Sequence, residues 1–143
     1  ATEEALQRQF AEALALPDGT QLDICLFWDI FSYLDGPALS AFVTALRPYV
    51  NNRTRSHGFG MLNAKAGLNH NEYGIRSEEL ISYRRRGGAQ PAVYPHSQRE
   101  LNQLLGHFHV STSRLMVDGH TEFVLRYDRE HKAEELQKSV FNF

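Results

Sequence analysis

Residues 22–28 read LDICLFW, and this short stretch decides the fold class. It is almost continuously apolar and shows no alternation of apolar and polar residues. A strand with one face in water alternates, whereas a strand inside a parallel sheet is covered on both faces and reads as a continuous apolar run. We therefore expect a buried strand here, central to a parallel sheet and covered on both faces.

The segments on either side of this strand predict helices and a second strand. Residues 2–15 carry apolar side chains at the spacing of one helical face, with Thr2 as the N-cap. A second helix should begin near Pro37, since proline is tolerated in the first helical turn, and Pro48 should close it. A shorter apolar run over residues 57–62 predicts another buried strand, so that strand, helix and strand form a βαβ unit. The apolar face of the second helix consists of Leu39, Phe42, Val43 and Leu46.

The later part of the chain predicts a capped helix and a hairpin. Ser97 is followed three residues later by Glu100, which is a capping box. Two β-favouring runs, residues 109–117 and 120–127, are separated by Asp118-Gly119, a pair suited to a tight antiparallel turn. The helix should bury a stripe made of Leu101, Leu104, Leu105 and Phe108.

Two segments lack a clear pattern. Residues 63–96 have no clean period, and a stretch of that length is rarely a passive connector, so we expect an insert or lid that folds over something. Residues 128–143 are charged with a thin apolar stripe, which predicts a weakly packed C-terminal tail helix. The expected organisation is one α/β domain over residues 1–143.

Composition narrows the class of protein. The chain has 143 residues, 42% hydrophobic and 22% charged, and a formal charge of −2, as in an ordinary globular domain. The single cysteine, Cys25, cannot form an internal disulfide and should be a buried thiol. The longest apolar run is too short to span a bilayer, and the first residues lack the features of a secretory signal, so we expect a cytoplasmic protein without a membrane partner.

Candidate ligand-binding residues follow the two predicted strands. In an open α/β sheet, ligands lie beyond the carboxyl ends of the strands. This rule places Trp28, Asp29, Ser32 and Tyr33 together at the carboxyl end of the first strand, and Asn63 and Lys65 are candidates for the same rim. Packing of the aromatic side chains and solvation of the polar ones are the alternative roles.

The insert adds a basic run whose role stays open. Arg84-Arg85-Arg86 next to Tyr83 could bind an anionic substrate, or could be a solvated loop. The charge of −2 and the lack of a nucleic-acid-binding motif argue against a nucleic-acid partner. His107 and His109 stand two apart without a third ligand at a recognisable spacing, so no metal is expected.

Two stretches resemble a known enzyme family. Residues 22–34, LDICLFWDIFSYL, followed by a helix that ends in Leu46-Arg47-Pro48, resemble the fourth strand and following helix of class I S-adenosylmethionine-dependent methyltransferases. Residues 94–101, YPHSQREL, resemble the start of the helix before the last hairpin of that family, here residues 110–127. The resemblance implies a partial Rossmann-like methyltransferase sheet: a βαβ unit, an insert, a helix and a closing antiparallel hairpin.

The resemblance also implies a cofactor and a set of contacts. It implies that Trp28, Asp29 and Tyr33 lie against S-adenosylmethionine, and that the insert and the rim, with Asn63, Tyr73 and Arg84, shape the pocket for a small-molecule acceptor. The glycine-rich cofactor loop of the family has no counterpart here, so the chain corresponds to the carboxyl-terminal half of the fold. Alone, it should bind the cofactor weakly or not at all.

A missing half would leave the strand at residues 24–28 on an open sheet edge, and unpaired backbone groups there invite another strand. The partner could be the missing N-terminal half, a second subunit, or a second copy of this chain. An alternative function is therefore a non-catalytic interaction or dimerisation module derived from the same fold.

Overall fold

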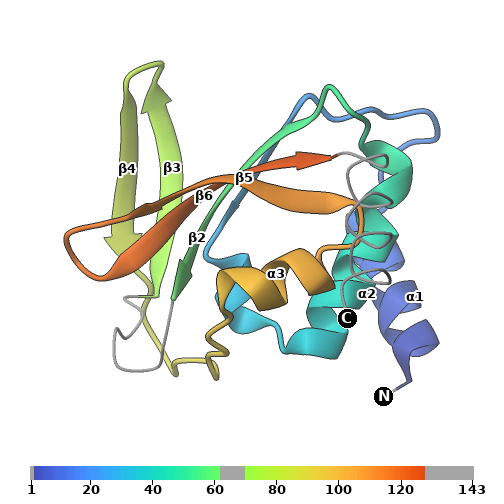
Figure 1. Ribbon diagram of the computed structural model, residues 1–143, viewed down its shortest axis with the longest axis horizontal. Helices are drawn as coiled ribbons and strands as arrows, with labels where there is room; N and C mark the ends of the chain where they lie inside the picture. Colours follow the sequence, from blue (N-terminus) through green and yellow to red (C-terminus); the bar gives the residue numbers. More distant parts are fainter. Residues whose placement is uncertain (1, 62–69, 128–143) are drawn as a thin grey trace, which may run out of the picture.

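The computed structural model describes residues 2–61 and 70–127 as a mixed α/β fold (Figure 1). Three α-helices lie together beside a four-stranded sheet, and a two-stranded hairpin stands apart from them (Figure 1). The helices are α1 (Glu3–Leu14), α2 (Gly36–Leu46) and α3 (Gln98–Leu104), with 3₁₀ turns η1 (Ile30–Tyr33) and η2 (Arg47–Tyr49). The strands are β1 (Ile24–Trp28), β2 (Arg55–Met61), β3 (Asn71–Ser77), β4 (Leu80–Arg85), β5 (Phe108–Leu115) and β6 (His120–Tyr127).

The larger sheet has the order β1-β2-β6-β5. β1 and β2 are parallel and are joined through α2, which is the predicted βαβ unit. β6 runs antiparallel to β2, and β5 runs antiparallel to β6, so the predicted hairpin closes the sheet. This confirms the partial Rossmann-like architecture and the expected order of elements.

The helix ends follow the predicted caps. The Thr2 hydroxyl accepts a hydrogen bond from the Ala5 amide at the start of α1, at 3.1 Å. The Asp35 carboxylate accepts a hydrogen bond from the Ala38 amide and caps α2, whose first turn contains Pro37. The predicted apolar face of α2 is buried along its whole length.

The core lies on one face of the larger sheet. It joins side chains from α2 and α3 to alternate residues of the strands, and α1 packs on the outside of α2 through Phe10, whose ring is 5.5 Å from that of Phe42. Glycine at position 60 is required by this packing, because a Cβ there would lie 2.4 Å from the Phe123 ring. Strand residues in this core are Cys25, Phe108, Val110, Phe123 and Leu125.

The other face of β1 is open, which corrects the expectation of a strand covered on both sides. Ile24 is 66% exposed and Leu26 is 38% exposed. Within the described residues β1 pairs with β2 alone, so it is an edge strand and not a central one. The described part of the chain supplies no second cover for this continuous apolar run.

The Ser97 N-cap and the hairpin are confirmed, with one change at the end of the helix. The Ser97 hydroxyl accepts from the Glu100 amide at 3.1 Å, and Leu101 and Leu105 are buried. Phe108 was predicted on the helix stripe, but α3 ends at Leu104 and Phe108 begins β5. The apolar side chain of Phe108 would be buried at the end of a helix or at the start of a strand, so its expected burial could not locate the end of the helix.

The predicted insert contains a hairpin that the sequence analysis did not find. β3 and β4 pair only with each other, with Tyr73 opposite Tyr83 and Ile75 opposite Ile81. These β-favouring residues recur at every second position, which is the overlooked signal. Asn63, Lys65 and the predicted tail helix over 128–143 lie outside the described residues. Within the described ranges, no helix is both long and apolar enough to cross a membrane.

Candidate functional site

β1 ends in an unusual backbone conformation at Trp28. Its φ angle is +48°, in the left-handed region that bulky residues rarely adopt. The turn places the next side chain, Asp29, at the carboxyl end of the strand, where it is 7% exposed. Strained residues of this kind persist where the surrounding structure holds them, and they cluster at functional sites.

Asp29 is held by a tyrosine from the hairpin. The Tyr73 hydroxyl donates to Asp29 Oδ2 at 2.7 Å. Burial raises the pKa of the Asp29 carboxyl, and the hydrogen bond from Tyr73 opposes this shift only in part. Burial and the neighbouring carboxylate raise the pKa of Tyr73, which therefore remains a hydrogen-bond donor at neutral pH.

Aromatic rings connect the hairpin to the sheet. The Tyr73 ring lies between those of Trp28 and Phe59, with centroid separations of 5.3 and 5.7 Å. Phe59 belongs to β2 and faces away from the helix-covered core. These contacts anchor β3 over the end of the sheet that carries Asp29.

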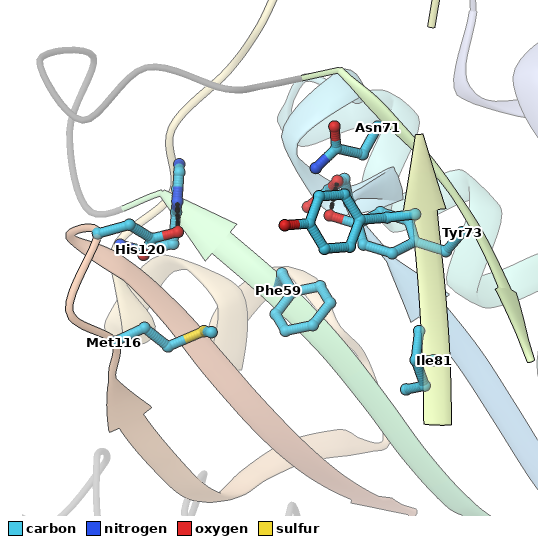
Figure 2. Close-up of a pocket in the computed structure, with 9 residues that line it drawn as sticks. Phe59, Asn71, Tyr73, Ile81, Met116 and His120 are labelled. Atoms are coloured by element: carbon cyan, nitrogen blue, oxygen red, sulfur yellow. Dashed lines mark hydrogen bonds and ion pairs between the residues drawn. The ribbon is translucent and has the colours of Figure 1, made fainter. Parts of the chain in front are cut away.

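A cavity of about 360 Å³ lies beneath these rings (Figure 2). Figure 2 shows Tyr73 and Ile81 on one side, Met116 and His120 on the other, and Phe59 between them. The volume falls within the usual range for small-molecule pockets. The described residues that line it are Asp29, Phe59, Asn71, Tyr73, Ile81, Tyr83, Met116, Asp118 and His120.

The hairpin of β5 and β6 contributes a hydrogen-bonded Asp–His pair to this cavity. Asp118 Oδ2 lies 2.9 Å from His120 Nδ1, and the Asp118 carboxylate also accepts from the His120 amide. Hydrogen bonding from His120 lowers the pKa of Asp118, so this carboxylate is ionised at neutral pH. The cavity therefore holds one buried carboxylate and one ionised, more exposed carboxylate.

Comparisons with known proteins agree with this architecture. No protein-family model matches the chain, and no curated protein matches it significantly. The structure of the pyocyanin biosynthetic protein PhzM matches with a TM-score of 0.50 at 16% identity, over 82% of this chain and 33% of that chain. This chain therefore spans one third of the length of that protein.

Two further structures are similar at slightly lower scores. An S-adenosylmethionine-dependent methyltransferase from Clostridium acetobutylicum matches with a TM-score of 0.49 at 11% identity, over 83% of this chain and 62% of that one. The glycopeptide N-methyltransferase MtfA, complexed with S-adenosyl-L-homocysteine, matches with a TM-score of 0.49 at 8% identity, over 82% and 58%.

The strand order, the helix before the closing hairpin and the match to PhzM decide the fold. The described residues form a methyltransferase-like half-fold. Its order of elements is that of the carboxyl-terminal half of the class I methyltransferase fold, as the resemblance implied. At these levels of identity, the similarity is one of fold.

The methyltransferase-like half-fold brings some of the predicted site residues together. Trp28, Asp29 and Tyr73 form one contiguous group. Tyr33 lies in η1 and its hydroxyl is 2.9 Å from His70 Nδ1, beside the cavity lining but not part of it. Arg84 is also outside the lining: its side chain is 83% exposed and its Nε lies 2.7 Å from a Glu72 carboxylate oxygen.

Several lining residues were missed from the sequence. Phe59 was seen only as part of a buried strand, and Met116, Asp118 and His120 only as parts of a hairpin. The Asp118-Gly119 pair was interpreted as a tight turn, and this structural role gave no reason to place Asp118 in a binding site. The half-fold places this turn beside the carboxyl end of β2 because β6 is antiparallel to β2, with Met61 opposite His120.

Proposed function

We propose that this chain is the carboxyl-terminal, acceptor-side half of an S-adenosylmethionine-dependent methyltransferase, active on a small acceptor when the missing half completes it. The observation that carries the proposal is the cavity at the carboxyl end of β1 and β2, where open α/β sheets bind ligands. The fold supports the proposal that a second half is needed, because the half-fold supplies the acceptor side of the site and only part of a cofactor site.

The residues beside the cavity fit the methionine end of the cofactor. Among the described residues, the buried Trp28 indole Nε1 has no hydrogen-bond partner, and we assign it as a donor to the carboxylate of the cofactor. The Asp29 carboxylate, 7% exposed, can accept from an ammonium group. We assign Trp28 and Tyr33 to the cofactor side, Tyr73 to the acceptor side, and Asp29 to the boundary between them.

Methyl transfer from this cofactor depends mainly on how the acceptor is positioned. When bound, the cofactor supplies a methyl group that its sulfonium already activates for transfer to a nucleophile. The chain's own contribution is to hold the acceptor in line with that methyl group and to keep water away. Tyr73 and Phe59 form an apolar wall for this purpose, with their ring centroids 5.7 Å apart. No residue is assigned as a general base.

The open face of β1 is the proposed docking surface for the missing half. Ile24 and Leu26 are exposed apolar residues of an edge strand whose partner on one side is absent from the described residues. Exposed edges and apolar patches of this kind bind another chain or another segment of the same chain. The completing partner is a missing N-terminal half, a second subunit or a second copy.

Calorimetric titration with S-adenosylmethionine tests the proposal. We expect the full chain alone to bind weakly or not at all, and the chain mixed with a partner that co-purifies with it to bind saturably. Trp28→Phe, which keeps the aromatic ring and removes the indole N–H, should weaken binding to the completed protein by about tenfold, the value of one hydrogen bond to a charged group. Absence of binding in both states would contradict the proposal.

A non-catalytic interaction module is the second candidate function. The specific observation in its favour is the same open strand edge, which can serve association without any cofactor. Association alone does not separate the two functions. The module is favoured if a stable complex forms at β1 and that complex does not bind S-adenosylmethionine.

A further inference from the structure

The cavity beside Asp29 has an acidic and aromatic lining that selects among ligands. Asp29 and Asp118 contribute carboxylates, and Phe59, Tyr73 and Tyr83 contribute rings. Among the described residues, no lysine or arginine lines it. His120 also lines the cavity and pairs with Asp118.

From this lining we propose that the acceptor is a small molecule with an aromatic or apolar body and a protonated amine. This inference rests on the proposed function and names its substrate class. The cavity of about 360 Å³ accommodates one ring and a short side chain.

Both the carboxylates and the aromatic rings of the lining favour a cationic ligand. Asp29 is desolvated at 7% exposure, and a desolvated carboxylate is stabilised by an ammonium group more than an exposed one is. The aromatic faces attract the same cation through their quadrupoles. An anionic ligand would meet repulsion from both carboxylates.

The basic run of the insert does not reverse this preference. Arg84 lies on the exposed side of the hairpin and pairs with Glu72 at 2.7 Å. Arg86 Nε lies 3.9 Å from the other oxygen of the same carboxylate. Arg84 and Arg86 are therefore partnered by Glu72, and no arginine of the run lines the cavity.

The test compares three probes of similar shape: 2-phenylethylamine, 2-phenylethanol and 3-phenylpropanoate, which are cationic, neutral and anionic at neutral pH. Trp28 is the single tryptophan of the chain and its ring lies 5.3 Å from that of Tyr73, so its fluorescence reports occupancy in the full chain without any cofactor. We expect the amine to bind about tenfold more tightly than the alcohol, and the acid more weakly than either. Equal binding of the three probes, or a preference for the acid, would overturn the proposal.

Two variants test whether the preference for the amine arises in this cavity. Asp29→Asn keeps the side-chain shape and should reduce the advantage of the amine over the alcohol to below about threefold. Asp18→Asn makes the same change on an exposed residue before β1 and should leave the ratio unchanged. An unchanged ratio in Asp29→Asn would overturn the assignment to Asp29.

A second pair of variants covers the case in which Asp29→Asn unfolds. Ile81→Lys places a positive charge on the half-exposed lining residue of β4 and should weaken amine binding by about tenfold. Leu80→Lys is the matched control, because Leu80 is the preceding residue of the strand, is similarly exposed and does not line the cavity. Equal effects of the two lysines would overturn the proposal.

S-adenosylmethionine also carries positive charge. A competition experiment therefore tests whether the amine probe binds at the acceptor site or at the cofactor site. In the completed protein, the amine and S-adenosylmethionine should bind together. Displacement of one by the other would overturn the acceptor assignment. Because the probe titrations need no cofactor, amine selectivity without S-adenosylmethionine binding would leave this inference standing and reject the proposed function.

Discussion

The two faces of the larger sheet are built very differently. On one face, Phe108, Phe123 and Leu125 are almost completely buried beneath α2 and α3. On the other face, Ile24 and Leu26 are exposed, and among residues 2–61 and 70–127 the hairpin of β3 and β4 covers the end near Phe59 (Figure 1). Among the described residues, the first face is a packed core, and the second is partly open with a small cavity at one end.

This difference shows where stability and function lie in the half-fold. Close packing beneath the helices contributes most of the free energy of folding. The open face contributes little while it is unpartnered, which leaves its residues free to serve association and ligand binding. Substitutions on the two faces should therefore separate effects on stability from effects on binding.

The largest effect is expected on the covered face. Phe123→Ala removes a ring that is 1% exposed and should lower the free energy of unfolding by about 3–5 kcal/mol, through lost burial and the cavity left behind. Val124→Ala, the next residue on the opposite face, should lower it by less than about 1 kcal/mol. Urea unfolding of both variants checks the comparison, and similar losses would show that both faces are equally packed.

A smaller effect is expected from overfilling the same face. Gly60→Ala would place a Cβ 2.4 Å from the Phe123 ring, so the ring must move, at about 1–3 kcal/mol. Gly87→Ala is the matched control, since a Cβ there has no atom within 4 Å. Thermal unfolding should separate the two variants, and equal midpoints would contradict the packing described for β2.

The pH dependence of stability tests the buried carboxylate at the edge of the open face. The pKa of Asp29 is raised in the folded chain above the ordinary value of about 4, so between these two values the folded state holds more protons than the unfolded one. Stability carried by this group is present at low pH and is lost as pH rises through the raised pKa. The stability of the wild-type chain relative to Asp29→Asn should therefore fall as pH rises above about 4. Urea unfolding at a series of pH values measures it, and a rise would contradict the desolvation of Asp29.

The smallest effect on the isolated chain is expected on the open strand. Leu26→Ala, at a residue that is 38% exposed, should change the free energy of unfolding by less than about 1 kcal/mol. The same substitution should measurably weaken association with a completing partner, because the side chain is buried there. Urea unfolding of the chain alone measures the first term, and sedimentation velocity with the partner measures the second. A large loss of stability in the chain alone would mean that this face is already covered.

The sequence was most informative where local chemistry acts alone. The caps at Thr2 and Ser97, and the turn at Asp118-Gly119, are local signals that the structure confirms. The apolar run of β1 correctly indicated a strand, and the missing glycine-rich loop correctly indicated an open edge. The end of α3 was misplaced because Phe108 is buried in a helix or a strand alike.

By itself, the sequence determined the helices and strands of the larger sheet and their order, because periodicity and capping depend on residues close together in the chain. The half-fold that they build was implied by the family resemblance. Only the tertiary structure decided which residues form the cavity. Asp29, Tyr73 and Asp118 come from three different segments, and they meet because β3 folds over Phe59 and the turn of β5 and β6 reaches the end of β2. Such contacts depend on chain geometry between distant residues, which no local pattern encodes.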